Sequence, residues 1–353
     1  MRRRSVLPVE AILVAGGLGT RLRPLTETRP KHLLPVAGVP FLTHQIVKLA
    51  RSGVRRIVLA TSYRAEEFEP VFGGGEEFGV RLDYVTENEP LGTAGALRNA
   101  ARVLESGPED PVVALNGDIL SGHDIANQVE HHEAAAADVT LHLVEVPDPR
   151  PFGCVPTDDA GRVLAFMEKS PEPVSRQVNA GCYVFRRRVL DEIPAGRPVS
   201  VERETFPDLL AGGCLLLGHA ESAYWLDVGT PEALIRASSD VVRGVARSPA
   251  YPLPPGERFL AADAEVDPGA SVSGGSAIGQ RARIGPGAVV DGGVIFDDAV
   301  VESGAVVRHS AVAAHATVGA RSRLYGAVVG ERAQVGSDRE LSDGVRIPPG
   351  TRV

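Results

Sequence analysis

A short glycine-rich stretch near the start of the chain could hold a ligand that carries phosphates. The stretch AILVAGGLGTRLRPLT, residues 11–26, places three glycines and then Arg21 directly after an apolar run, and Lys31 follows soon after. Bare backbone N–H groups in such a loop can face an anion. Arg21 and Lys31 would add positive charge for a polyphosphate. The alternative is a tight turn whose basic side chains are merely solvated, and the loop alone leaves both interpretations open.

The spacing of this loop excludes two common nucleotide-binding loops. A dinucleotide-binding loop needs the pattern G-x-G-x-x-G, which Gly16, Gly17 and Gly19 do not supply. Pro24 and Pro30 also prevent a long helix from starting directly after the glycines. No Gly-Lys-Ser/Thr follows, so the stretch is not a Walker loop either.

Two aspartates follow apolar runs that we expect to be strands. Asp118 follows the run at 111–116, and Asp227 follows Tyr-Trp-Leu at 224–226. Ligands of α/β proteins collect at the carboxyl ends of strands, where carboxylates could hold a cation. Each aspartate could equally be a turn or capping residue, which is a common role for this residue type.

The elements that would position these residues alternate between strands and helices. Helical spacing of apolar residues and good helix formers predict helices over 41–53, 93–104 and 230–245. Short apolar runs predict strands at 11–15, 56–61, 111–116 and 138–146. This alternation predicts an α/β sandwich with a mostly parallel sheet.

The last ninety residues show a different, sixfold repeat. Branched residues recur every six positions with single slips of register, at Val266, Val272, Ile278, Ile284, Val290, Ile295, Val301, Val307, Val312, Val318, Leu324, Val329 and Val335. Ala or Ser stands two positions before most of them. A sixfold repeat that points one branched residue inward per step predicts a parallel β-helix with three faces per coil. Four prolines within 248–257 mark the boundary before it.

Composition limits the class of protein. The chain has 353 residues, of which 43% are hydrophobic, and a net charge of −8. This charge argues against a general nucleic-acid or anionic-membrane binder. Three scattered cysteines favour free thiols in a reducing compartment, and no apolar stretch of signal-peptide or membrane-spanning length follows the basic start. We therefore expect a cytoplasmic protein with neither nucleic acid nor membrane as partner.

Many motifs in the chain, taken in order, resemble those of the sugar-1-phosphate nucleotidyltransferases, also called NDP-sugar pyrophosphorylases. The resemblance is closest to the GDP-mannose pyrophosphorylase branch, which includes the mannose-1-phosphate guanylyltransferases. It rests on GGLGTRLRPLT, PKHLLPVAGVPF, EPLGTAGALRNA, LNGDIL, FGCVPTD, FMEKS, NAGCYVF, SVERETFPDLL, YWLDVGTPEAL and the repeat tail.

The resemblance implies roles for individual residues. It assigns the nucleotide to Ala15, Gly16, Gly17, Gly19, Thr20, Arg21, Lys31, Gly92 and Thr93. It assigns the sugar phosphate to Gly153, Glu168, Lys169, Asn179, Gly181 and Trp225, with Glu202 as a further wall of the pocket. It makes Asp118 and Asp227 ligands of Mg²⁺, and it makes Arg21, Lys31, Asp118 and Lys169 the catalytic set.

Two of these assignments have competing explanations. Neighbours on a strand point to opposite faces, so Glu168 and Lys169 reach one site only if the strand bends or ends there. Otherwise they are a solvated charge pair. Trp225, the single tryptophan, could instead be a core residue. His32 departs from the proline common in this branch, and it could alter either the phosphate pocket or only the loop.

We expect a Mg²⁺-dependent enzyme that makes an NDP-sugar and pyrophosphate, with GTP and mannose 1-phosphate as the favoured pair. The alternative is a guanylyl-, adenylyl- or other nucleotidyltransferase for a different sugar or carba-sugar 1-phosphate, such as a glucose, a heptose or a cyclitol like valienol. A less favoured alternative is a non-catalytic regulatory subunit of the same fold. The tail is too short for the acetyltransferase of bifunctional relatives.

The expected fold is a Rossmann-like nucleotidyltransferase sandwich with a mixed, mostly parallel sheet, followed by a left-handed parallel β-helix of hexapeptide repeats. The catalytic domain would span residues 1–247, a proline-rich linker 248–259 and the β-helix 260–353. Stacking of the β-helix tail between subunits would give a homo-oligomer.

Overall fold

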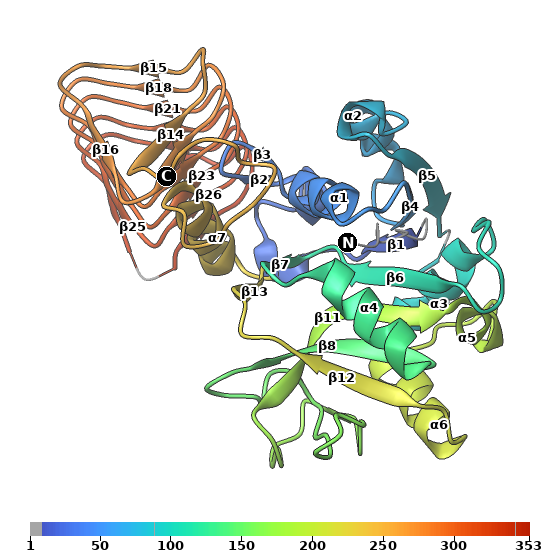
Figure 1. Cartoon of the computed structure of the whole chain (residues 1–353). Helices are drawn as coiled ribbons and strands as arrows, with labels where there is room; N and C mark the ends of the chain where they lie inside the picture. The colour runs from blue at the N-terminus through green and yellow to red at the C-terminus, as the bar shows by residue number, and fades with distance from the viewer. Residues whose placement is uncertain (1–8, 88, 343) are drawn as a thin grey trace. The chain divides into compact units, whose positions relative to one another are not determined.

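The computed structural model describes residues 9–87, 89–342 and 344–353. The basic start of the chain, on which the expectation of no secretion signal partly rests, lies outside these residues. Contacts divide the chain into two compact units, each discontinuous in sequence (Figure 1). The first runs to Gly17 and resumes over Ile46–Trp225, and the second comprises Leu18–Gln45 and Leu226–Val353.

The first unit is built on a nine-stranded mixed sheet. The strand order is β10-β9-β11-β6-β1-β4-β5, and β8 and β12 continue from β11. Strands β6, β1, β4 and β5 run parallel, whereas β11 runs antiparallel to β6 and β8. The strands are β1 (Glu10–Ala15), β4 (Arg56–Thr61), β5 (Arg81–Thr86), β6 (Pro111–Asn116), β8 (Val139–Glu145), β9 (Gly153–Cys154), β10 (Met167–Glu168), β11 (Gln177–Arg186) and β12 (Leu216–Ala220). The predicted mixed, mostly parallel sheet is confirmed.

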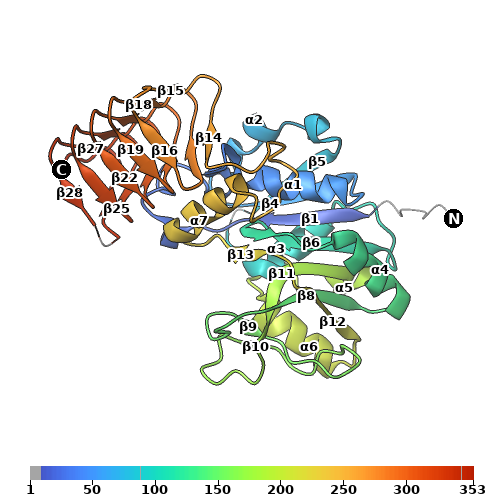
Figure 2. The same ribbon diagram turned by 60° about the vertical axis from the view of Figure 1, so that its left-hand side comes forward.

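Helices cover both faces of this sheet. Leu97 of α3 packs with Ile12 of β1 and Leu141 of β8 in the main core of the unit. Gln128 of α4 instead donates to the carbonyl of Thr140, whose side chain points to the other face. The helices of this unit are α2 (Glu69–Phe72), α3 (Gly92–Ala101), α4 (Ile125–Ala135), α5 (Arg187–Glu192), α6 (Phe206–Ala211), the 3₁₀ turns η3 (Ala65–Glu67) and η4 (Glu76–Phe78), and the π-helical turn η5 (Val201–Thr205). Figure 2 shows α3 and α4 beside the sheet.

The strands and helices predicted from apolar spacing are confirmed. The runs at 56–61 and 111–116 form β4 and β6 with the same bounds. The predicted helix at 41–53 is α1 (Phe41–Arg51), which turns Leu42, Ile46 and Leu49 inward. The helix predicted to begin at Thr93 begins one residue earlier, at Gly92.

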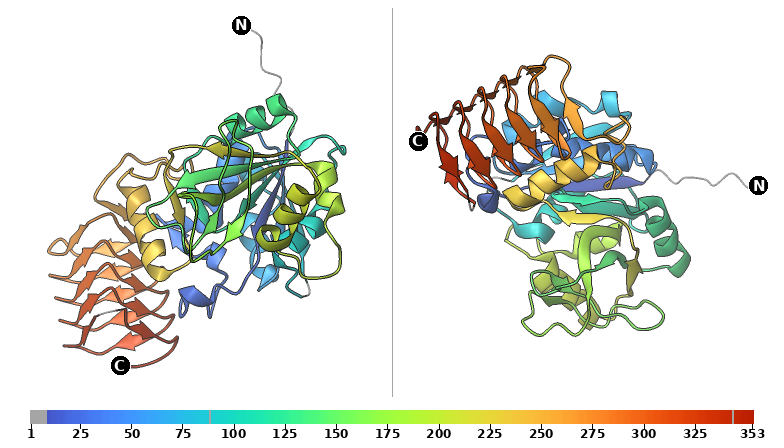
Figure 3. Two further views of the ribbon diagram at one scale, coloured as in Figure 1. Left: turned by 90° about the horizontal axis from the view of Figure 1, so that it is seen from below. Right: turned by 90° about the vertical axis from the view of Figure 1, so that its left-hand side faces the viewer.

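The second unit carries three parallel sheets that the chain visits in rotation. Arg283 pairs with Val300 and Val300 with Thr317, so the repeat is 17 residues at these coils. The first sheet holds β14 (Arg258–Leu260), β17 (Ser276–Ile278), β20 (Val294–Ile295), β23 (Ala311–Val312), β26 (Val328–Val329) and β29 (Arg346–Ile347). The second holds β15 (Glu265–Val266), β18 (Arg283–Ile284), β21 (Val300–Val301), β24 (Thr317–Val318) and β27 (Gln334–Val335), and the third holds β16 (Ser271–Ser273), β19 (Val289–Asp291), β22 (Val306–Arg308), β25 (Arg323–Tyr325) and β28 (Glu340–Leu341). Figure 3 shows the successive coils as a regular stack.

The sixfold pattern predicts the interior of this stack correctly. Every branched residue of the predicted row from Val272 to Val335 is buried, and so are the small residues Ser276, Ala282 and Ala299 that precede them. The corners turn through left-handed residues, among them His309 and His315. Small interior residues allow the narrow prism, and branched residues fill it.

Helix α7 (Pro231–Val242) joins the remaining parts of the second unit. Thr230 caps it by accepting a hydrogen bond from the N–H of Ala233 at 3.2 Å. Ser239 donates to the carbonyl of Gly274 in the stack, and Ser238 accepts from the N–H of Ala37. Ala37 lies between β2 (Pro35–Val36) and β3 (Val39–Pro40), and the unit also contains the 3₁₀ turns η1 (Thr20–Leu22) and η2 (Lys31–Leu33). The chain also contains β7 (Ile119–Ser121) and β13 (Trp225–Asp227).

None of the helices within the described residues is both long and apolar enough to cross a bilayer. Cys154, Cys182 and Cys214 are free thiols, as expected from their spacing.

Candidate active site

Parallel strands bring several predicted residues to one edge of the first unit's sheet. Ala15 at the end of β1 pairs with Thr61 at the end of β4, and Val14 pairs with Asn116 at the end of β6. Because these strands end together, the glycine loop after β1 and Asp118 after β6 leave the sheet at the same edge. Asp118 lies in the turn between β6 and β7 and is partly buried.

Backbone geometry explains the two glycines of the loop in this unit. Gly17 has φ 95°, a conformation that disfavours any side chain, and its N–H donates to Ser62 Oγ at 3.2 Å. A Cβ added to Gly16 would lie 3.1 Å from the same hydroxyl oxygen. The loop backbone therefore passes close to the residue that follows β4.

The predicted sugar-contacting residues Asn179 and Gly181 lie where β11 is irregular. The register of β11 against β8 shifts between Asn179 and Tyr183. Asn179 Oδ1 accepts from the N–H of Gly181 at 3.1 Å, and its Nδ2 donates to Tyr183 Oη at 2.7 Å. Gly181 has φ 74°, and a Cβ there would lie 3.0 Å from Asn116 Nδ2. The irregular segment thus lies against the end of β6, beside the turn that carries Asp118.

Strand β10 ends at Glu168, so Glu168 and Lys169 meet the condition under which two neighbouring side chains can reach one site. Lys169 has φ 51°, a left-handed conformation, and Lys169 Nζ lies 3.3 Å from Glu168 Oε1. Glu168 is paired with Gly153 across β9 and β10, and a Cβ on Gly153 would lie 2.9 Å from Glu168 Oε2. The side chains of Glu168 and Lys169 therefore meet, with 17% and 61% of their surfaces exposed.

Glu202 adds a second carboxylate near this pair. It lies in η5, and the hydroxyl of Ser200 donates to its Oε2 at 2.9 Å. Burial raises the pKa of Glu202, and the negative charge of Glu168 raises it further, while Lys169 opposes that effect. Glu168, Lys169 and Glu202 thus form a group with polar hydrogen-bonding capacity of the kind that sugar hydroxyls require.

Gly92 and Thr93 begin α3 beside the same segment. Gly92 has φ 69°, and a Cβ there would overlap the carbonyl of Val199. That carbonyl accepts from the N–H of Ala94 at 3.0 Å. The start of α3 is therefore held against the residues that lead into η5 and Glu202.

Trp225 combines packing with a polar contact. Its Nε1 donates to the carbonyl of Ala180 at 3.0 Å, and its ring meets Phe152 edge-on at 5.2 Å between centroids. The ring is only partly buried, and its neighbours Ala180 and Phe152 adjoin Gly181 and Gly153, which are predicted to contact the sugar phosphate. Trp225 therefore packs beside this part of the candidate site and not in a deep core.

The second unit contains the other predicted residues. Arg21 Nη2 lies 3.8 Å from Asp227 Oδ2, which is the last residue of β13. Gly19, with φ 58°, begins the turn η1, which contains Thr20 and Arg21. A Cβ on Gly19 would lie 3.2 Å from Cβ of Lys31. Gly19, Lys31 and the turn that carries Arg21 thus lie close together, and Arg21 pairs with Asp227.

His32 belongs to the packing of this loop. Its side chain is 1% exposed within the turn η2, whereas Lys31 beside it is partly exposed. The position that departs from the family pattern thus lies inside the unit, and this favours a role in the loop's packing.

The carboxylates present fit a magnesium ion. Mg²⁺ takes hard oxygen ligands and needs only one or two protein carboxylates when phosphates supply the rest. A Cβ on Gly229 would lie 2.9 Å from Asp227 Oδ1 and would overlap the Arg21 guanidinium, so the bare backbone of Gly229 lets Arg21 lie beside this carboxylate. Among the described residues, no group of three or more His, Cys, Asp or Glu side chains forms a ready-made metal site.

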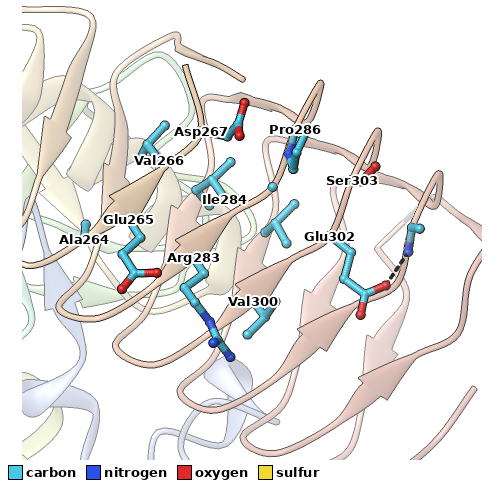
Figure 4. Close-up of a pocket in the computed structure, with 13 residues that line it drawn as sticks. Ala264, Glu265, Val266, Asp267, Arg283, Ile284, Pro286, Val300, Glu302 and Ser303 are labelled. Atoms are coloured by element: carbon cyan, nitrogen blue, oxygen red, sulfur yellow. Dashed lines mark hydrogen bonds between the residues drawn. The ribbon is translucent and has the colours of Figure 1, made fainter. Parts of the chain in front are cut away.

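A broad pocket elsewhere contains none of the predicted site residues. It lies on the face of the stack formed by β15, β18 and β21, where Glu265, Arg283 and Glu302 line it (Figure 4). Glu302 uses its carboxylate there to accept from the N–H of Ala320 at 2.9 Å. The residues predicted to do the chemistry therefore lie outside this hollow.

Sequence reasoning missed three residues around the site. Ser62 follows β4 at the same edge as the glycine loop, so the strand-end argument could have found it. Asn116 closes β6 beside Gly181. Arg346, in the last coil of the stack, contacts the backbone of the glycine loop, and no local sequence signal indicates this.

Two family descriptions match successive parts of the chain. Residues 10–244 match "Nucleotidyl transferase", and residues 255–350 match "GMPPB C-terminal domain".

Named relatives are similar over most of their lengths. A mannose-1-phosphate guanylyltransferase of Mycobacterium tuberculosis is 51% identical over 74% of this chain and 72% of its own. A mannose-1-phosphate guanyltransferase of Yarrowia lipolytica is 35% identical over 75% of this chain and 73% of its own length. The crystal structure of a putative glucose-1-phosphate thymidylyltransferase from Bacillus anthracis aligns with TM-score 0.60 and 28% identity, over 68% of this chain and 95% of that one.

Proposed function

We propose, since this chain belongs to the nucleotidyl transferase family and is close to the mannose-1-phosphate guanylyltransferases, that it transfers GMP from GTP to mannose 1-phosphate and releases pyrophosphate. The observation that carries this proposal is the 51% identity to a mannose-1-phosphate guanylyltransferase over 263 residues. The presence of the glycine loop, Arg21 and both aspartates argues against a non-catalytic subunit.

The reaction is a displacement at phosphorus. A phosphate oxygen of mannose 1-phosphate attacks the α-phosphorus of GTP, a new P–O bond forms, and the bond to the β-phosphate oxygen breaks as pyrophosphate leaves. The attacking oxygen already carries negative charge, so no covalent enzyme intermediate is needed. The protein's main tasks are to position two anions and to offset their charge.

We assign the nucleotide to Ala15, Gly16, Gly17, Gly19, Thr20, Gly92 and Thr93, with Arg21 and Lys31 as the groups that bind the triphosphate. Arg21 can contact two phosphate oxygens at once, and Lys31 supplies a point charge. The Arg21 side chain is 66% exposed, so a ligand can reach it.

We assign the sugar phosphate to the group around β9, β10 and β11. Lys169 would hold the attacking phosphate, and Glu168 would accept hydrogen bonds from sugar hydroxyls. Gly153, Asn179, Gly181 and Trp225 would complete the wall. The left-handed backbone at Lys169 supports this assignment, because the two neighbouring side chains meet there.

Asp118 and Asp227 would hold Mg²⁺, which, when bound, offsets negative charge on the triphosphate. Asp118 follows β6 and Asp227 is the last residue of β13, so both carboxylates lie at strand ends.

We also propose the larger organisation expected from the sequence. Residues 1–247 would act as the catalytic domain, 248–259 as a linker and 260–353 as a left-handed parallel β-helix that joins subunits into a homo-oligomer. The three free thiols support a reducing compartment such as the cytoplasm. Sedimentation of the full-length chain tests the proposed homo-oligomer, and a monomeric result would contradict this proposal.

A substrate panel tests the proposed function. Pyrophosphate release is measured for four nucleoside triphosphates, each with mannose, glucose and heptose 1-phosphates and a cyclitol phosphate. The proposal predicts the highest kcat/KM for GTP with mannose 1-phosphate. A higher value for another pair would assign the chain to that pair.

A further inference from the structure

Arg346 connects the last coil of the stack to the glycine loop within the second unit. Its Nη1 donates to the carbonyl oxygen of Arg21 at 2.8 Å and to that of Arg23 at 3.0 Å. These carbonyls lie at the end of the 3₁₀ turn η1, where carbonyls lack partners within the turn and attract positive charge. One guanidinium nitrogen has two N–H groups and can serve both carbonyls.

The same side chain also reaches the helix that follows Asp227. Arg346 Nη2 lies 3.8 Å from Glu232 Oε1 in the first turn of α7. Asp227 precedes this turn by a few residues and pairs with Arg21 at 3.8 Å. Arg346 thus contacts the loop that carries Arg21 and also the start of α7, the helix that follows Asp227.

The coil that carries Arg346 is firmly held. Arg346 pairs with Val328 and Ile347 pairs with Val329 across β26 and β29. Ile347 is 2% exposed inside the stack. A side chain that extends from a packed strand can fix a loop better than one that extends from another loop, because its own backbone does not have to be ordered.

We propose that Arg346 is a positioning residue for the triphosphate-binding loop, through which the stacked coils fix Arg21 for the nucleotide. The inference rests on the proposed function for the identity of the nucleotide. The stack would therefore contribute to GTP binding as well as to assembly.

The test compares Arg346→Ala and Arg346→Lys with a matched control, Arg323→Ala, which removes an exposed arginine from β25 of the same stack. For each full-length variant, kcat and the KM values for GTP and mannose 1-phosphate are measured together with Tm. Arg346→Ala should raise the KM for GTP about 10-fold, as the loss of charged hydrogen bonds predicts, and should leave the KM for mannose 1-phosphate within about 2-fold. Arg346→Lys should recover part of this loss, and Arg323→Ala should resemble the wild type.

Two results would overturn the inference. One is an unchanged KM for GTP in Arg346→Ala. The other is an equal rise in both KM values together with a lower Tm, which is what a purely structural role would produce. If the wild type prefers another nucleotide in the substrate panel, the proposed function fails but the inference does not. The same variants are then compared with that nucleotide, and an unchanged KM would still reject the role of Arg346.

Discussion

Glu168 and Lys169 are neighbours in the chain, yet their side chains meet, with Lys169 Nζ 3.3 Å from Glu168 Oε1. The left-handed conformation of Lys169 makes this possible, because it ends β10 and turns the second side chain toward the first. An exposed ion pair of this kind adds little to stability. Its position beside Gly153 and Glu202 suits the binding of a phosphate and its sugar.

Replacing Lys169 should therefore weaken sugar phosphate binding more than it affects the fold. We expect Lys169→Met to lower kcat/KM for mannose 1-phosphate at least about 100-fold, since a charged contact to phosphate is lost. Lys169→Arg should keep more activity because it keeps the charge. Steady-state kinetics at saturating GTP measure this, and a kcat/KM for mannose 1-phosphate within 2-fold of the wild type in Lys169→Met would exclude the assignment.

Gly153 should be needed for its lack of a side chain. A Cβ at this position would lie 2.9 Å from Glu168 Oε2 and 2.8 Å from the ring of Phe166. We expect Gly153→Ala to displace Glu168 and to raise the KM for mannose 1-phosphate several-fold. Gly256→Ala is the matched control, because its added Cβ would meet nothing closer than 3.8 Å. Equal kinetics for the two variants would contradict the prediction.

Both aspartates should take part in the dependence of activity on divalent metal. We expect Asp118→Asn and Asp227→Asn each to lower kcat at least about 100-fold, and to raise the MgCl₂ concentration needed for half-maximal activity. The measurement is a MgCl₂ titration at saturating substrates. A variant with near-wild-type activity and an unchanged titration would remove that aspartate from the metal site.

Buried histidines should make the fold sensitive to acid. His142 is fully buried, and its ring stacks on that of His123 with 3.8 Å between the ring centroids. Neither ring nitrogen of His142 hydrogen-bonds to any residue that the structure describes. Burial, together with the positive charge of Lys48 and the proximity of His219, lowers its pKa to about 3. The unfolded chain, in which histidine has its ordinary pKa near 6.5, therefore binds a proton first as pH falls.

The resulting loss of stability has a definite direction and range. The contribution of neutral His142 is complete above about pH 6.5 and falls as pH decreases toward 3, by up to about 1.4 kcal/mol per pH unit. Burial also lowers the pKa of His44 to about 4 and that of His132 to about 3, so the effects add. Urea unfolding at pH 7.5 and 5.5 should show a smaller loss of stability in His142→Leu than in the wild type. Equal losses would show that His142 is not responsible.

Residues that depend on local spacing could be predicted from the sequence. Strand ends placed Asp118 and the glycine loop at one sheet edge, and the sixfold row from Val272 to Val335 predicted the interior of the stack. The first feature follows from short apolar runs and the second from periodicity, and local sequence carries both directly.

Contacts between distant segments could not be predicted in this way. The carbonyl oxygens of Arg21 and Arg23 accept hydrogen bonds from Arg346, more than three hundred residues away. The meeting of Glu168 with Lys169 depends on one backbone angle, which two charged residues do not reveal. Such features depend on the assembled unit and not on any single motif.

The fate of the α-phosphate tests the central claim most directly. GTP labelled at its α-phosphate is incubated with mannose 1-phosphate, MgCl₂ and the full-length chain, and the products are separated. Nucleotidyl transfer predicts that the label appears in GDP-mannose and that unlabelled pyrophosphate forms in equal amount. Label found in GDP or free GMP, with no sugar nucleotide, would contradict the account.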